Sequence, residues 1–238
     1  MSDLFLIVFA VLPAAALMAY ICKKDKLEKE SPALLRSLAL CGVISTVPAI
    51  LLEAAGSAAA QALFPHDGFL YAFTVNFIVI AVVEEGVKFC FLRRASWHSP
   101  EFNCQFDGVV YAVFVSLGFA LLENILYVLR YGFGVAVARA LLSVPGHGCF
   151  GVFMGAFYGL AKRCANYGCP VRSRKNLRLS VLIPALLHGM YDFIASTEYI
   201  NAGAFLAFIG AIFFLGVRLT NKLSKEDRYI DAKHWYSL

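Results

Sequence analysis

The sequence predicts an all-α membrane protein, a polytopic bundle of about seven transmembrane helices that forms one integral membrane domain over residues 1–238. Two properties of the composition indicate this class. Of the 238 residues, 60% are hydrophobic and only 16% are charged, whereas soluble domains have about 45–50% apolar and about 25% charged residues. At about 20 residues per crossing, the length allows seven crossings with short loops and leaves no room for a second globular domain.

Long apolar stretches place the crossings along the chain. We predict helices at about 3–21, 33–52, 69–92, 108–129, 140–161, 179–197 and 199–219. Residues 53–68 are predicted as an outer loop, in which the small residues 54–62 are suited to a short interfacial helix. Residues 95–107 and 162–178 are predicted as polar cytoplasmic loops, and residues 220–238 as a polar cytoplasmic tail.

The basic residues decide the orientation. In an alternating arrangement of seven crossings, eighteen of the 21 Lys and Arg residues lie on one side. The positive-inside rule assigns that side to the cytoplasm, so the N-terminus is expected outside and the C-terminus in the cytoplasm. Only Arg130 and Arg139 fall on the outer side, and Lys88 lies within a crossing. The expected surroundings are the lipid bilayer, with no nucleic-acid partner.

Ionisable residues lie inside four of the predicted crossings. On insertion scales each costs at least about 2.5–3.5 kcal/mol, so such residues are rarely kept without a task. They are Glu84, Glu85 and Lys88 in the third crossing, Glu123 in the fourth, His147 in the fifth, and His188 and Asp192 in the sixth. At about 1.5 Å per residue, the acids and histidines lie roughly 13–20 Å from the cytoplasmic charges. We therefore expect one shared site near the middle of the membrane.

The spacing within the helices suggests roles. Glu84 and Lys88 stand at i and i+4, the favourable order for an ion pair, which would leave Glu85 free to face the bundle interior. Asp192 stands one turn after His188 and can fix its tautomer.

Neighbouring residues are expected to support the site. Phe119 lies one turn before Glu123, and Asn124 can bond a neighbouring helix. Glycines continue from His147 at intervals of four, at positions 151, 155 and 159. Small residues at this spacing predict a close helix contact.

Each group also has a purely structural interpretation. Glu84, Glu85 and Lys88 could form an ion-pair network between helices. Glu123 could be satisfied by a hydroxyl group or by Arg130, His147 could make one interhelical hydrogen bond, and the pair of His188 and Asp192 could only stiffen the bundle.

The chemistry that fits these residue types is hydrolysis. Glu123, His147 and His188 match a three-ligand catalytic zinc site with a position left for water. Glu85 would then be the general base that later protonates the leaving amine. The same groups could also act without metal, with a glutamate activating water and the imidazoles stabilising the oxyanion.

At these residues the chain resembles the PrsW-type intramembrane proteases, a family grouped with the CAAX prenyl endopeptidases and the Aph-type subunit of gamma-secretase. Glu84-Glu85-Gly86-Val87-Lys88 matches EExxK, Phe119 to Glu123 matches FxxxE, His147 matches the histidine of the third motif, and His188 to Asp192 matches HxxxD. The resemblance covers a core of about residues 70–195. It implies a multi-pass endopeptidase of the bacterial cytoplasmic membrane. In the family's namesake, the task is the first (site-1) cut in a single-pass anti-sigma factor in stress signalling.

Two other classes of function compete with this one. A proton-coupled transporter would use acids and histidines as a relay, but it would favour two symmetric halves, and the sequence shows no such repeat. A non-catalytic assembly subunit on the same fold would be expected to lose the glutamate pair, which is intact here.

Overall fold

The computed structural model describes residues 3–66, 68–197 and 201–230, and this part of the chain is almost entirely helical. The predicted all-α class is confirmed. The only pairing of strand type in these ranges is an isolated bridge between Cys104 and Tyr229. The elements are α1 (Asp3–Lys24), α2 (Pro32–Leu63), α3 (Phe69–Phe73), η1 (Thr74–Val82), α4 (Val83–Ser96), α5 (Asp107–Tyr131), α6 (Phe133–Ala138), η2 (Arg139–Ser143), α7 (Val144–Asn166), α8 (Pro170–Ser196) and α9 (Ala202–Lys225).

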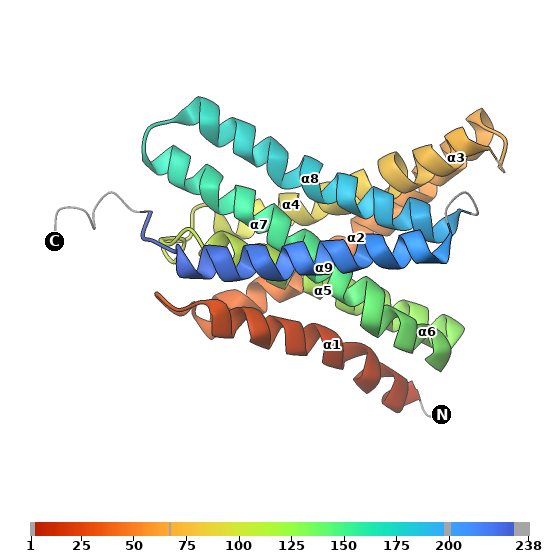
Figure 1. Ribbon diagram of the computed structural model, residues 1–238, viewed down its shortest axis with the longest axis horizontal. Helices are drawn as coiled ribbons and strands as arrows, with labels where there is room; N and C mark the ends of the chain where they lie inside the picture. The colour runs from red at the N-terminus through yellow and green to blue at the C-terminus, as the bar shows by residue number, and fades with distance from the viewer. Residues whose placement is uncertain (1–2, 67, 198–200, 231–238) are drawn as a thin grey trace.

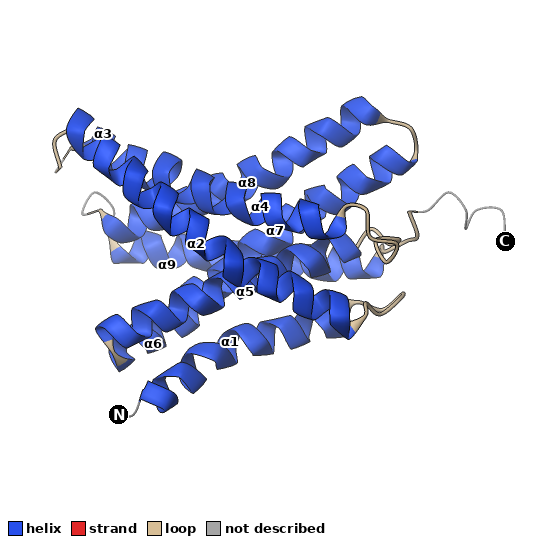
Figure 2. Cartoon of the chain, turned by 180° about the vertical axis from the view of Figure 1, so that it is seen from behind, coloured by secondary structure: helices blue, strands red, loops and turns tan. Residues whose placement is uncertain are grey.

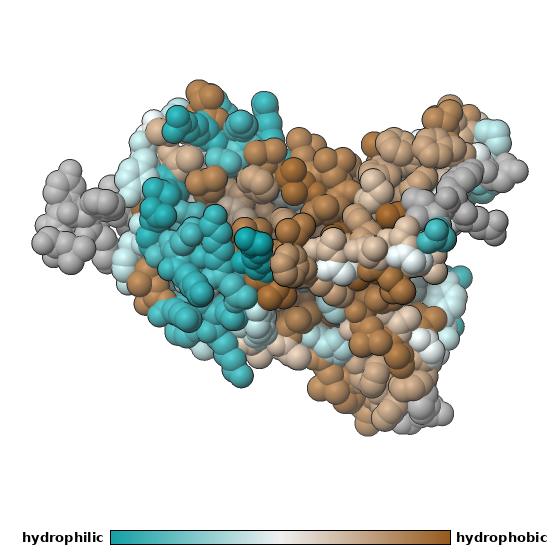
Figure 3. Space-filling model, in the orientation of Figure 1, coloured by the Kyte–Doolittle hydropathy of each residue, from teal (hydrophilic) through white to brown (hydrophobic). Residues whose placement is uncertain are grey.

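The helices form an elongated bundle whose ends differ in polarity. In the described ranges, six helical runs are long and apolar enough to cross a membrane: α1, α2, α5, the run from α6 to α7, α8 and α9. The third predicted crossing is helical from Phe69 to Ser96, in three consecutive segments. α1 and α9 run in the same direction (Figure 1), as an odd number of crossings requires. Polar residues gather at the end where α1 and α9 finish (Figure 3), and the rest of that face is largely apolar.

Several predicted loops are helical in the structure. α2 continues to Leu63, so the predicted outer loop at 53–68 shrinks to its last few residues. The small-residue run is rich in alanine, the strongest helix former, and its single glycine is outweighed because the run contains no proline. The predicted loop at 162–178 is likewise wrong, because α7 ends at Asn166 and α8 begins at Pro170. Proline suits the first turn of a helix, and the basic residues that follow it lie on α8.

The predicted tail is only partly separate from the bundle. α9 extends to Lys225, and the residues after it return to the loop before α5. Gln105 N donates to Arg228 O at 3.0 Å, and Ile230 N donates to Asn103 O at 2.7 Å. Ile230 is buried as a result. Residues 231–238, including Lys233, lie outside the described residues.

Small residues bring α5 close to α2 and α7. A Cβ atom added at Gly155 of α7 would overlap the Gly108 carbonyl of α5, and one at Gly42 of α2 would overlap the Val115 carbonyl. The predicted close contact of the α7 glycines is therefore confirmed. Ser116 Oγ of α5 also donates to His147 O at 2.7 Å, which fixes the start of α7 against α5.

Two segments of widened helical turn precede the helices with the predicted site residues. η1 leads directly into α4, and η2 leads directly into α7. Such π-type turns are frequent at functional sites because they change the direction in which side chains point. Figure 2 shows α2 and α5 crossing near the middle of the bundle and diverging toward the end where α3 and α6 lie.

Candidate active site

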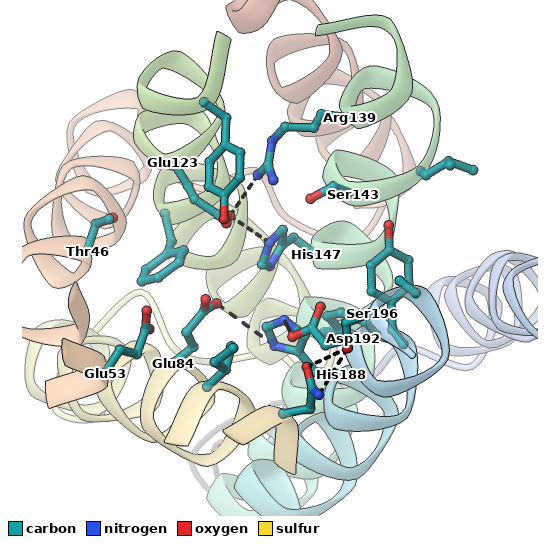
Figure 4. Close-up of a pocket in the computed structure, with 18 of the residues that line it drawn as sticks. Thr46, Glu53, Glu84, Glu123, Arg139, Ser143, His147, His188, Asp192 and Ser196 are labelled. Atoms are coloured by element: carbon teal, nitrogen blue, oxygen red, sulfur yellow. Dashed lines mark hydrogen bonds and ion pairs between the residues drawn. The ribbon is translucent and has the colours of Figure 1, made fainter. Parts of the chain in front are cut away.

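The structure brings the predicted residues of four helices to the wall and floor of one cavity. The cavity has a volume of about 590 Å³ and is lined by Glu84, Phe119, Glu123, His147, His188 and Asp192 among others. These side chains come from α4, α5, α7 and α8 and point toward one another (Figure 4). The shared site that the sequence predicts is therefore present as a geometric arrangement.

Lys88 lies at the centre of the polar group and is fully buried. Its ammonium group donates to Glu84 Oε2 and Glu85 Oε1, both at 2.8 Å, and to His147 Nδ1 at 3.2 Å. It also lies 4.1 Å from the centre of the Phe119 ring, a cation–π contact. One lysine serves both glutamates because positions i+3 and i+4 lie on the same side of a helix.

The two glutamates differ from the prediction in which of them faces the cavity. Glu84 lines the cavity, with 6% of its side chain exposed. Glu85 is fully buried beneath it and is bound by both Lys88 and His188. The expectation that Lys88 holds Glu84 alone and frees Glu85 is therefore wrong.

The two histidines are held in the same way. His147 Nε2 lies 3.0 Å from Glu123 Oε2, and His188 Nε2 lies 3.2 Å from Asp192 Oδ2. Both Nδ1 atoms face the glutamate pair: that of His147 meets Lys88, and that of His188 lies 3.1 Å from Glu85 Oε1. A carboxylate behind Nε2 fixes the ring and its tautomer and directs the Nδ1 lone pair forward. Because carboxylates only accept hydrogen bonds, His188 Nδ1 can face Glu85 only with a proton or a metal ion between them.

Glu123 is anchored by Arg139 instead of Arg130. Arg139 Nη2 lies 2.9 Å from Glu123 Oε2, and Arg139 Nε donates to Asn124 Oδ1 at 3.0 Å. Asn124 Nδ2 in turn donates to Ala10 O of α1 at 2.9 Å, so Asn124 bonds a neighbouring helix as expected. Arg130 lies two turns further along α5, about 10 Å along the axis, whereas Arg139 approaches from the facing segment η2.

Sequence reasoning missed several polar residues that line the cavity, among them Arg139, Glu53, Asn76 and Ser196. Glu53 lies on the helical continuation of α2, and its Oε1 is buried with no hydrogen-bond partner in the described structure. Asn76 Nδ2 donates to Ser196 Oγ at 3.1 Å and joins η1 to α8. The sequence did carry a signal for two of these residues. Arg139 departs from the positive-inside pattern, and Glu53 is an acid in an otherwise apolar stretch.

The donor set fits a metal ion. Glu84, Glu85, His147 and His188 each offer a ligand atom, and these atoms lie within 4.8 Å of one another. Glu85 Oε2 is buried without a hydrogen-bond partner. Among the described residues of the site, five carboxylates face two cations, Lys88 and Arg139. A buried excess of negative charge favours a further cation. Glu123, which the sequence grouped with the two histidines as a ligand, is not in this set.

Fold and site together define the class of an intramembrane hydrolase. A sequence model described as "PrsW family intramembrane metalloprotease" matches residues 30–217. The chain belongs to the PrsW family. It is a protease and a multi-pass protein of the bacterial inner membrane, which decides against the transporter and the non-catalytic subunit.

Curated relatives support the same conclusion. The chain is 38% identical to "Protease PrsW" of Oceanobacillus iheyensis over 77% of its own length and 80% of the relative. It is 37% identical to the protein of that name from Geobacillus kaustophilus, over 79% of both chains. The protein of that name from Bacillus subtilis is 33% identical over 89% of this chain and 92% of the relative. No solved structure matches the chain significantly.

Proposed function

We propose that this protease makes the first cut in a single-pass membrane protein of the anti-sigma-factor type, at a peptide bond in the outer half of the membrane. The proposal depends on where the cavity lies in the bundle, which is toward the end opposite the polar end. Its lining includes Leu126, Tyr127, Arg139 and Phe205, which belong to the ends of their helices remote from the polar end of the bundle. A substrate segment is therefore expected to enter from the outer side, and the family resemblance supplies the kind of substrate.

The proposed metal is zinc, held by His147, His188 and Glu85. Two imidazoles and one carboxylate form a known type of catalytic zinc site with one open position. Glu85 replaces Glu123 in this assignment because it lies on the Nδ1 side of both rings, whereas Glu123 lies behind His147. When bound, zinc would lower the pKa of a water molecule and polarise the substrate carbonyl.

The remaining residues act as proton carriers and positioning groups. Glu84 is the glutamate that faces the cavity, so we assign it as the general base that takes the proton of the attacking water and passes it to the leaving amine. Asp192 and Glu123 hold the two imidazoles in place through Nε2. Arg139 holds Glu123 and faces the cavity with a positive charge.

One observation favours a second mechanism without metal. The Lys88 ammonium already bonds both glutamates and His147 Nδ1, so a cation is already present among these donors. In that case Glu84 would activate water while His147 and Arg139 stabilise the oxyanion.

The test uses purified full-length protein in detergent with a panel of single-pass membrane peptides. We expect the wild type to cut near the outer end of the apolar segment and to contain about one zinc per chain. Glu84→Gln should abolish cutting but keep the metal, and His188→Ala should lose both. Glu226→Gln, at the polar end of α9, is the matched control for the lost charge. Cutting that persists in Glu84→Gln with a retained fold would refute the general base, and full activity without zinc would establish the second mechanism.

A further inference from the structure

Glu53 is a cavity acid that the proposed reaction does not use. It lies on α2, three residues after Ile50, which itself follows Thr46 by four residues. At this spacing the three side chains share one helix face. All three line the cavity. Figure 4 shows Glu53 and Glu84 at the same wall, facing the histidines. α2 is otherwise apolar here, with Leu51 and Leu52 exposed on its outer surface.

Glu53 is the cavity acid without a partner in the described part of the chain. Glu84 is paired with Lys88, Glu123 with Arg139 and His147, and Asp192 with His188. No hydrogen bond or ion pair engages Glu53, and its Oε1 is buried. It also lies outside the group of four residues that could hold the metal.

Glu53 is half-buried, and its Oε1 is the oxygen that is buried without a partner. A buried acceptor without a hydrogen bond is costly, so Glu53 is expected to gain a partner during the working cycle. The acids Glu84 and Glu123 line the same cavity and carry the same charge, so a molecule inside the cavity is the expected source of the partner. The lining of the cavity carries four carboxylates, and Arg139 is its one permanently charged cation. Such a potential attracts positive charge and rejects negative charge.

We propose that Glu53 is a specificity-determining residue that binds a lysine or arginine side chain of the substrate, close to the bond that is cut. This inference rests on the proposed function, since it requires a peptide segment in the cavity. The α2 wall would hold the basic side chain while the histidine wall holds the peptide bond. Burial of the pair makes its charge-assisted hydrogen bond strong enough to select among sequences.

The test compares matched peptides and matched enzyme variants. A single-pass peptide is prepared with lysine, glutamine or glutamate at each position of its outer half in turn. For the wild type we expect one position at which lysine raises kcat/KM at least tenfold over glutamine. Glu53→Gln should lose this preference, and Glu53→Lys should reverse it toward glutamate. Glu226→Gln, which removes the same charge far from the cavity, should keep the lysine preference.

Binding is measured separately so that this inference and the proposed reaction can fail independently. Labelled peptides are titrated into Glu84→Gln and into Glu84→Gln combined with Glu53→Gln, with fluorescence anisotropy as the readout. Lysine-dependent binding that disappears in the double variant supports the role of Glu53, even if the wild type cuts no peptide and the proposed reaction falls. The inference is overturned if cutting and binding do not depend on the charge of the peptide in the wild type or in either Glu53 variant. The protease assignment would still stand in that case.

Discussion

Two regions of this molecule each bury several acids, and the negative charge of those acids is stabilised differently in the two regions. In the membrane site the acids meet cations and imidazoles, with Lys88 between Glu84 and Glu85 and Arg139 on Glu123. At the polar end, the buried Asp25, Glu30 and Asp107 lie in or beside the segments around the start of α5, and none of them forms an ion pair in the described structure.

The acids at the polar end rely on neutral donors. Asp107 Oδ2 accepts from the backbone N–H groups of Asn103 and Cys104, and Glu30 Oε2 accepts from the Tyr111 hydroxyl at 2.7 Å. Burial raises the pKa of Asp25 to about 6 and the pKa of Glu30 to about 7. Burial without an ion pair thus shifts the pKa of these two acids upward, and Glu30 serves as a structural hydrogen-bond group. The membrane site instead gathers cations and imidazoles around its carboxylates, which is the arrangement that hydrolysis needs.

The largest expected effect is on activity. Glu84→Gln keeps the shape of the side chain and removes the proposed base, so kcat should fall by about 10²–10⁴-fold. The measurement is peptide cleavage by purified protein, with thermal unfolding as the check of the fold. A kcat within tenfold of the wild type would show that the charge of Glu84 serves only the structure, as the acids at the polar end do.

Lys88→Met should be the most damaging change to stability. It leaves two buried carboxylates without their cation, and breaking a buried ion pair costs about 3–5 kcal/mol. We expect a large drop in the midpoint of thermal unfolding in detergent. If zinc shares this site, added zinc should restore part of the loss by replacing the missing charge. A variant as stable as the wild type without any metal would contradict the central role of the ammonium group.

Arg139→Gln should have an intermediate effect on activity. The change frees Glu123, and through it His147, without touching the glutamate pair. Because misplacement of a catalytic group is costly, we expect roughly a tenfold loss in kcat with little change in unfolding temperature. Arg130→Gln is the matched control, since Arg130 contacts the Tyr131 ring instead of the site. Equal losses in the two variants would point to a general effect of outer-side charge.

The smallest effect concerns the polar end and its dependence on pH. Burial raises the pKa of Glu30 above its ordinary value of 4.5, and Asp25 and Glu101 raise it further, while the Tyr111 hydrogen bond lowers it. The unfolded chain therefore releases this proton first as pH rises, so stability declines between about pH 4.5 and 7 and stays lower above that.

Glu30→Gln removes this decline. We expect the variant to gain about 1–2 kcal/mol over the wild type at pH 8 and little at pH 4.5. The midpoints of thermal unfolding at the two pH values give the measurement. A gain of the same size at both would mean that Glu30 does not titrate in this window.

The sequence was a good guide to the site because intramembrane charge is rare. Each of Glu84, Glu123, His147 and His188 stands out against an apolar background, and the spacing of Asp192 after His188 predicted their contact. The sequence was a poor guide where two different side-chain orientations fit the same helical spacing. Helical spacing cannot tell which of two adjacent glutamates faces a cavity, because the packing of α4 against α5, α7 and α8 sets that rotation.

The sequence alone determined the all-α membrane class, the polar end of the bundle and the charged residues and histidines that gather around Lys88, since hydropathy and charge act locally along the chain. Tertiary structure decided the partners: Lys88 between both glutamates, Arg139 on Glu123, and Glu53 in the cavity instead of an outer loop. These depend on how far α2 continues and where it separates from α5. Such geometry arises from contacts between helices distant in sequence, which no local pattern records.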